Sequence, residues 1–215
     1  MPVRHHHCQH SPKGRCQPAA QVSAQPPAGW LDSLLRNRHA YILGAGPNGT
    51  PFHKLDPDGL KIALNSAIVL PWRFDIWMVF DYGATQYHWF KTNTSAHRVF
   101  GTDLAKVSQP DVTFPYQPTM HSVDEFRYGV LHGGASIAGC AIQLCYWLGC
   151  EHITLVGIDQ WGSKHFDGTI GAPKHTDRVW STVKLLEKII RITTAHGITV
   201  DSLSRTKLSV PLVKQ

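Results

Sequence analysis

The sequence lacks a hydrophobic run long enough to cross a membrane. Its longest nearly apolar stretch extends from Ser136 to Cys150, which is shorter than the roughly 20 residues that a membrane-spanning helix needs. The first 29 residues also lack the continuous apolar stretch of a secretory signal. Together these absences predict a cytoplasmic protein with no integral membrane segment.

Cysteine is scarce, and its spacing is not that of a metal site. Two of the five cysteines lie in the first 16 residues, and the other three, Cys140, Cys145 and Cys150, recur every five positions. Five steps along a helix rotate a side chain by about 140°, so these three thiols do not share one helical face. We therefore predict small residues in a buried helix and no metal site.

Acidic residues are absent from the first 29 positions. This segment contains Arg4, Lys13 and Arg15, five of the 14 prolines and no apolar periodicity. Such a composition predicts a disordered basic tail at residues 1–29. The tail carries three of the six net positive charges, so residues 30–215 keep an excess of only three. That excess, without Lys and Arg interleaved with aromatics, argues against nucleic acid as a partner.

Residues 30–215 have the hydrophobic content of one folded domain. Compact apolar runs predict buried strands at 39–43, 61–65, 74–80 and 152–156, with weaker candidates at 99–100 and 112–114 and a last strand that starts at 198–200. Helices are predicted over 134–148 and 176–195. Strands that are apolar on both faces and alternate with helices predict an α/β fold. We expect a single Rossmann-like doubly wound, mostly parallel sheet with helices on both faces.

In such folds the ligand lies beyond the carboxyl ends of the strands. After the first strand, Gly44 to Gly49 has the form G-x-G-x-x-G, which either binds a phosphate through exposed amides or makes a tight turn that needs glycine. Binding of NAD is disfavoured, because Pro47 and Pro51 interrupt a helix there. The second strand also ends in Asn65 rather than in an acid.

Three more polar residues are predicted at strand ends. Asn65 either reads a base or ribose hydroxyl or caps the following turn. Asp81 and Asp159 follow the third strand and the 152–156 strand. Each either accepts hydrogen bonds from sugar hydroxyls, holds magnesium, or caps local structure.

A histidine at the start of the last helix is a candidate general base. His175 follows a loop with glycines at 162, 168 and 171, and a mobile loop that ends in a histidine is typical of catalytic lids. His132 and His165 offer the same chemistry. Position alone does not choose among the three.

Four segments together resemble a known family. The series GAGPNG, ALNSA, FDIWMVFDYG and GGASIAGCAIQLCYWLGCEHITLVGIDQ resembles the Rossmann-like family of unknown-function domains that includes archaeal hydroxymethyl-dihydropterin diphosphokinase and flagellar motility accessory factors. It is also similar to the related bacterial sialyltransferases that use CMP-sialic acid. The likeness extends from about Tyr41 to Leu208, and its closest part is the His175-led helix followed by ITVDSLS.

The resemblance implies a role for each matching residue. His175 would deprotonate the acceptor hydroxyl. Asn65 and the loop residues would hold the cytidine and its phosphate, and the helix start would lie beside them. The substrate-binding residues so implied, taken with the two strand-end acids, are Gly44, Gly46, Pro47, Asn48, Asn65, Asp81, Gly134, Ser136 and Asp159. The sialyltransferases need no metal and use tyrosines at the leaving group, for which Tyr116 and Tyr128 are candidates. Ala45 and Asn48 depart from the polar residue and the serine usual in the sialyltransferase loop.

The sequence thus predicts a glycosyltransferase-like enzyme. It would transfer a sialic or nonulosonic acid from a CMP-activated donor to a glycan or small-molecule acceptor, without a required cofactor. One alternative is magnesium-dependent pyrophosphoryl transfer from ATP to a pterin-like alcohol, with Asp81 and Asp159 holding the metal. Another is a nucleotide-binding module without catalysis.

Overall fold

The computed structural model describes Leu34 and most of the chain from Arg38 to Val213. The described residues are 34, 38–114, 116–117, 125–126, 131–132, 136–160, 165–166 and 176–213. The basic tail predicted at residues 1–29 lies outside them, as do Gly134, Tyr128 and His175.

Seven short segments form one sheet in which every pair of neighbouring strands is parallel. They are β1 (His39–Leu43), β2 (Leu60–Leu64), β3 (Ile76–Val79), β4 (His97–Gly101), β5 (Val112–Phe114), β8 (His152–Val156) and β9 (Thr199–Ser202). Two further strands, β6 (Tyr116–Gln117) and β7 (Leu131–His132), form a separate parallel pair. The predicted strand at 61–65 ends one residue early because Asn65 adopts a φ of +49°.

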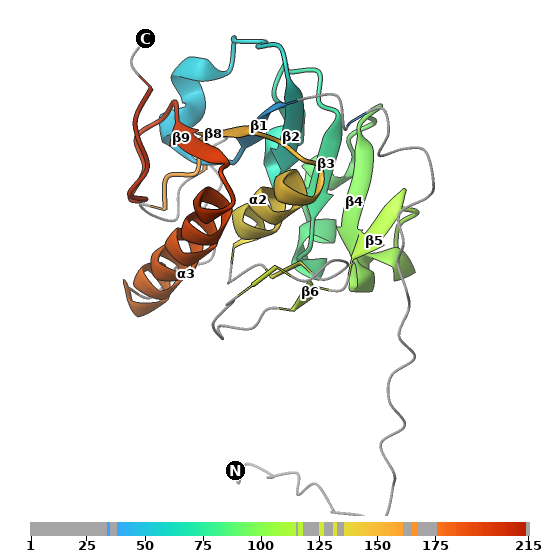
Figure 1. The fold of residues 1–215 in the computed structure, drawn as a ribbon. Coiled ribbons are helices and arrows are strands. Elements are labelled where there is room, and N and C mark those ends of the chain that lie inside the picture. The colour runs from blue at the N-terminus through green and yellow to red at the C-terminus, as the bar shows by residue number, and fades with distance from the viewer. Residues whose placement is uncertain are drawn as a thin grey trace, which may run out of the picture.

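The strand order is β5-β4-β3-β2-β1-β8-β9. The chain therefore moves outward from β1 to β5 and then returns to the other side of β1 for β8 and β9, as Figure 1 shows. The order reverses between β1 and β8. In doubly wound sheets the carboxyl ends at such a switch point border the ligand crevice.

Two α-helices, α2 (Ile137–Trp147) and α3 (Thr176–Ala195), pack against each other on one side of the sheet (Figure 1). The helix predicted over 176–195 is confirmed. The helix predicted over 134–148 is shorter, because Ser136 has extended backbone and caps α2 by accepting the Ala138 N–H. The predicted burial of the cysteines is also confirmed, since Cys140, Cys145 and Cys150 are all buried as free thiols.

The connections between β1 and β5 contain 3-10 helices instead of α-helices. These are η1 (Pro47–Phe52), η2 (Asn65–Val69), η3 (Tyr82–Gln86), η4 (His88–Lys91) and η5 (Thr102–Lys106). Prolines at 47, 51, 57 and 71 limit any longer helix in the first two connections. The fold is thus the expected Rossmann-like α/β sheet, with short 3-10 segments covering much of its second face.

Alternate strand residues build a core on each face of the sheet. On the helical face, Ile42, Ile62 and Met78 pack with residues of α2 and α3. On the other face, Trp77 and Phe100 lie at the centre of a second cluster that includes residues of η2, η4 and η5. Both clusters are apolar, and their burial stabilises the packing of the strands against the elements on each face. No helix of the described residues is long and apolar enough to cross a bilayer.

Candidate functional site

The glycine loop after β1 packs directly against the chain that follows β8. A Cβ added to Gly46 would lie 2.5 Å from the Asp159 Cγ, and one added to Gly49 would lie 2.9 Å from the Gly157 Cα. Gly157 itself has a φ of +65° and would place a Cβ 2.8 Å from the Gly44 carbonyl oxygen. The sequence left open whether the glycines make a phosphate loop or a tight turn. Here they permit two backbones to meet.

Most amides of this loop already donate within the fold. Gly44 N–H donates to the Val156 carbonyl at 2.8 Å, and Gly46 N–H donates to the Gly157 carbonyl at 2.8 Å. Gly49 N–H donates to the Gly46 carbonyl at 3.1 Å. The loop is thereby pinned to the end of β8, which fixes the shape of the sheet edge at the switch point.

Asp159 is the acid at this junction. The residue is only 4% exposed, and its Oδ2 accepts the backbone N–H of Asn48 at 2.7 Å. Its Oδ1 is buried and accepts no hydrogen bond from the described residues. Burial raises the pKa of this carboxyl to about 6, and the hydrogen bond from Asn48 opposes the rise. The carboxyl can therefore change protonation state near neutral pH.

Gln160 and the segment after β9 lie around Asp159 and the glycine loop. Gln160 follows Asp159 with a φ of +57°, and its Oε1 is also buried without a donor among the described residues. Lys207 N–H donates to the Asp159 carbonyl at 3.1 Å, and the Asn48 Nδ2 donates to the Arg205 carbonyl at 3.0 Å. The segment after β9 therefore closes the junction of the two loops.

Asn65 stands at the end of β2, on the other side of β1. Its positive φ lets the chain turn at once into η2, and its carbonyl accepts the Trp77 Nε1–H at 3.0 Å. Its Oδ1 is buried and unpartnered within the described chain, as is the Oγ of Ser66. No side-chain hydrogen bond caps η2. The capping role that the sequence left open for the Asn65 side chain is thus absent there.

Asp81 differs from Asp159 in both exposure and bonding. It is exposed at the end of β3, and its Oδ1 accepts the Gly83 N–H at 2.8 Å, which caps η3. β3 and β8 are three strand spacings apart, or about 14 Å. The capping interpretation of Asp81 is confirmed, and the two acids stand at separate places on the edge.

Some of the remaining candidate residues lie in the part of the chain that the structure describes, and others lie outside it. Pro47 begins η1 and is exposed. Ser136 uses its hydroxyl to cap α2. The position of His132 in β7 is described without its side chain, and His165 is half-buried beside Phe166, whose N–H donates to the Ala45 carbonyl. Gly134 and His175 lie outside the described residues, so their roles stay predictions.

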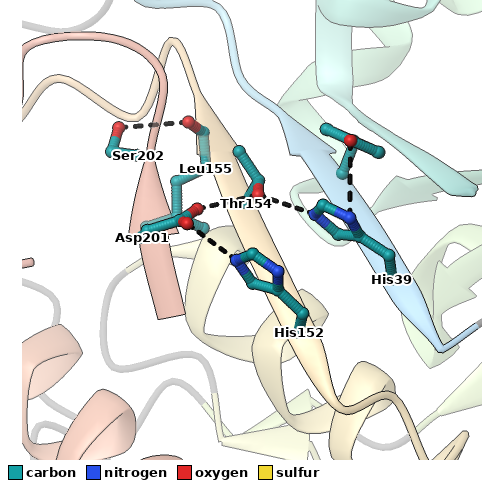
Figure 2. Close-up of polar contacts among 7 residues, drawn as sticks. His39, His152, Thr154, Leu155, Asp201 and Ser202 are labelled. Carbon is teal, nitrogen blue, oxygen red and sulfur yellow. Dashed lines mark hydrogen bonds and ion pairs between the residues drawn. The ribbon is translucent and has the colours of Figure 1, made fainter. Parts of the chain in front are cut away.

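A second group of polar side chains lies on the sheet face opposite α2 and α3. Figure 2 shows His39, His152, Thr154 and Asp201 pointing toward one another from β1, β8 and β9. The Nε2 of His152 is 2.7 Å from the Asp201 Oδ2, and Thr154 donates to the Asp201 Oδ1 at 2.7 Å. The His39 Nε2 is 2.8 Å from the Thr154 Oγ1, and the two histidine rings stack at 4.1 Å.

The bonding order within this group fixes one tautomer. Because the Thr154 hydroxyl donates to Asp201, it accepts at its other side, so His39 carries its proton on Nε2. The pKa of His39 is lowered, mainly by burial and then by the neighbouring His152. Sequence reasoning missed this group, although the alternation of His152 and Thr154 with buried apolar residues in β8 was a signal of a polar face.

No three His, Cys, Asp or Glu side chains among the described residues gather as metal ligands. No protein-family model matches the sequence, and no curated protein or solved structure matches it either. The family resemblance therefore stays a prediction from the motifs. The structural candidates are the switch-point residues and the histidine-containing group.

Proposed function

We propose that this protein is a glycosyltransferase-like enzyme that transfers a sialic or nonulosonic acid from a CMP-activated donor to an acceptor hydroxyl. The observation that carries the proposal is the buried carboxylate of Asp159, which has an oxygen without a donor among the described residues. It lies at the switch point, where doubly wound sheets bind their ligands. The motif resemblance supplies the reaction class.

The strand ends support a ligand of nucleoside size. β2 and β8 flank β1, so Asn65 and Asp159 follow strands that are two spacings apart, or about 10 Å. Both side chains offer an oxygen that has no hydrogen-bond partner among the described residues. In this proposal Asn65 and Asp159 bind the nucleoside between them. The amino end of α2, at Ser136, points toward the same edge of the sheet. That direction follows because the other end of α2 leads to Glu151, whose N–H donates to the Arg38 carbonyl just before β1.

The proposed step forms one carbon–oxygen bond, breaks another, and transfers one proton. The acceptor oxygen attacks the anomeric carbon of the donor sugar, and the bond from that carbon to the phosphate oxygen breaks. CMP leaves with the bonding electron pair, and His175 takes the proton of the acceptor hydroxyl. A tyrosine, Tyr116 or Tyr128, stabilises the charge on the departing phosphate. The proposal requires no metal.

The geometry gives less support to the magnesium-dependent alternative. That reaction would use Asp81 and Asp159 on one ion, and magnesium binds its oxygen ligands at about 2.0–2.1 Å. Two ligands of one ion must then lie within about 4 Å of each other. The strands that carry these acids are three spacings apart, about 14 Å, and Asp81 already caps η3.

A binding screen tests the nucleotide preference. We expect CMP to raise the melting temperature more than UMP, ADP, GDP or ATP, with no dependence on magnesium. Asp159→Asn should remove most of the CMP effect, whereas Asp81→Asn, which alters the other strand-end acid, should keep it. A larger effect of ATP that requires magnesium would support the alternative reaction.

A transfer assay tests catalysis separately. His175→Ala should abolish transfer and donor hydrolysis while CMP binding stays nearly intact, because a general base acts on the acceptor and not on the nucleotide. His165→Ala is the matched control, since it alters a rival histidine. Unchanged turnover in His175→Ala would contradict the proposed base, and binding without turnover of any CMP-sugar would indicate a non-catalytic module.

A further inference from the structure

The glycine loop has few means of holding a phosphate. A phosphate-binding loop offers several free backbone N–H groups to the ligand. Here Gly44, Gly46 and Gly49 donate to carbonyls of the fold, Asn48 donates to Asp159, and Pro47 has no N–H. Of the six positions from 44 to 49, this leaves the amide of Ala45.

The loop also lacks the space that its glycines suggest. Glycine in a phosphate loop keeps room for the ligand to approach the backbone. At Gly46 that room is taken by Asp159, whose Cγ and Oδ2 would lie 2.5 Å and 2.6 Å from an added Cβ. The glycines are therefore needed for contact between the loop and the end of β8.

The negative charge beside the loop also disfavours a bound phosphate. The Asp159 carboxylate lies directly against the loop and accepts the Asn48 N–H. A carboxylate with a phosphate beside it, in a partly buried site, is unfavourable because like charges repel strongly where the dielectric is low. An anion is thus the wrong chemistry for this position.

The buried acceptor atoms without donors in the described chain indicate which ligand groups would fit this edge of the sheet. The Oδ1 of Asp159, the Oδ1 of Asn65 and the Oε1 of Gln160 are buried hydrogen-bond acceptors without donors in the described chain. A buried acceptor without a donor is costly, so a ligand that supplies donors gains by filling these positions. The two amides can rotate to present either end, but an ionised carboxylate only accepts. Asp159 therefore sets the preference.

We propose that the ligand meets this edge of the sheet through hydrogen-bond donors, namely the hydroxyl or amino groups of a sugar or nucleobase, and that the glycine loop binds no phosphate. The inference rests on the proposed function in one respect, because it takes this edge as the ligand site. It reverses the role that the motif resemblance gives to the loop: the phosphate of a nucleotide projects away from residues 44–49.

Nucleosides and phosphates separate the two roles experimentally. Calorimetric titration of the full chain would use cytidine, uridine, adenosine and guanosine, their 5′-monophosphates, and inorganic pyrophosphate. We expect the preferred nucleoside to bind within about tenfold of its monophosphate, and pyrophosphate to show no binding. Asp159→Asn replaces the free acceptor with an amide, so it should weaken the nucleoside and the monophosphate by the same factor, about 10- to 100-fold, as for loss of a hydrogen bond to a charged group.

Asp75→Asn is the matched control. Asp75 also accepts a backbone N–H, that of Lys61 at 2.8 Å, but it lies at the amino end of β3, on the opposite edge of the sheet. This variant should bind every probe as the parent chain does. A loss in both variants would mark a general effect on the fold and would contradict the assignment to Asp159.

The other outcomes distinguish this inference from the proposed function. Binding of pyrophosphate, or tighter binding of monophosphates to Asp159→Asn, would overturn the inference while a nucleotide-dependent reaction stands. A nucleoside that binds through Asp159, with no sugar transfer from any CMP-activated donor, would keep the inference and reject the glycosyltransferase. If no nucleoside binds, the inference is wrong even where CMP binds.

Discussion

Two buried carboxylates, one in β9 and one just beyond the neighbouring strand β8, differ in their hydrogen bonding. Asp201 in β9 is 8% exposed, and both of its oxygens have partners, in Thr154 and His152 (Figure 2). Asp159, three residues beyond β8, is 4% exposed, and one of its oxygens has no partner among the described residues. The two acids are alike in burial and in their place beside β8. They differ in whether the part of the chain that the structure describes supplies hydrogen-bond partners to both carboxylate oxygens.

This difference is the one expected if Asp201 is structural and Asp159 binds a ligand, as proposed. A buried polar group that is fully hydrogen-bonded stabilises a fold, whereas one left unsatisfied costs free energy and persists where a ligand uses it. Asp201 closes a chain of bonds that links three strands. Asp159 has one acceptor oxygen without a partner among the described residues, at the sheet edge where ligands bind in folds of this kind. Substitutions at Asp201 and at Asp159 test this difference.

The largest effect is expected from removal of the satisfied acid. Asp201→Ala should lower the free energy of unfolding by about 3 kcal/mol, because it breaks two hydrogen bonds and leaves the buried Thr154 hydroxyl and the His152 ring without their acceptor. Urea denaturation measures the change. Asp201→Asn keeps an acceptor for Thr154 and should lose about 1 kcal/mol. Equal small losses in both variants would mean that the bonding chain contributes little.

The packing beside Asp159 should give the next largest effect. Gly46→Ala places a methyl group 2.5 Å from the Asp159 Cγ and from the Gly157 carbonyl oxygen, so we expect a loss of about 2–3 kcal/mol from overpacking. Gly149→Ala is the control: it has a φ of +73° but no atom within 4 Å of the added Cβ, and backbone strain alone should cost about 1 kcal/mol. Thermal or urea unfolding compares the two. A tolerated Gly46→Ala would show that the loop can move away from β8.

Replacement of the unsatisfied acid should instead stabilise the free protein. The pKa of Asp159 is about 6 in the fold against 3.8 for an ordinary aspartate, so between these values the folded protein keeps a proton that the unfolded chain releases. Stability then falls as pH rises through this window and stays lower above it. Asp159→Asn removes the loss, so it should be more stable than the parent chain at pH 8 by about 1 kcal/mol after allowance for solvent screening.

The same variant should show no advantage near pH 4, where the parent carboxyl holds its proton in the folded state. Urea midpoints at the two pH values measure the difference. A gain at pH 8 together with weaker nucleoside binding would be the expected trade between stability and function. A loss of stability at pH 8 would contradict the comparison, because it would mean that Asp159 is as structural as Asp201.

The sequence predicted the strands and the strand-end acid because both depend on local patterns. Apolar runs identify β1 and β8, and the rule for parallel sheets points to Asp159 and Asn65. The role of the glycine loop was not predictable. The letters GAGPNG do not reveal whether an amide is free or already donates to β8, since that depends on residues more than 100 positions away.

The histidine-containing group escaped prediction for a similar reason. His39 and His152 are 113 positions apart, and only the parallel register of β1 with β8 places them opposite each other. Thr154 and Asp201 meet through the register of β8 with β9. Side-chain networks across parallel strands depend on which strands become neighbours, and the sheet order here follows from a chain reversal that no single motif encodes.

The smallest effect is expected from the histidine side of the satisfied group. The pKa of His39 is lowered in the fold, by burial first and by His152 second, so the unfolded chain binds a proton more readily. Stability contributed by neutral His39 is therefore present above the ordinary value of 6.5 and is lost as pH falls below it. Between pH 7.5 and 5.5, His39→Gln should lose less stability than the parent chain, by a few tenths of a kcal/mol, since the ring is partly exposed.

His88→Gln, at an exposed position in η4, is the control and should leave the pH dependence of stability unchanged. If His39→Gln instead keeps the full acid sensitivity in urea titrations, His39 does not sense pH, and the contribution of Asp201 is confined to its bonds with Thr154 and His152.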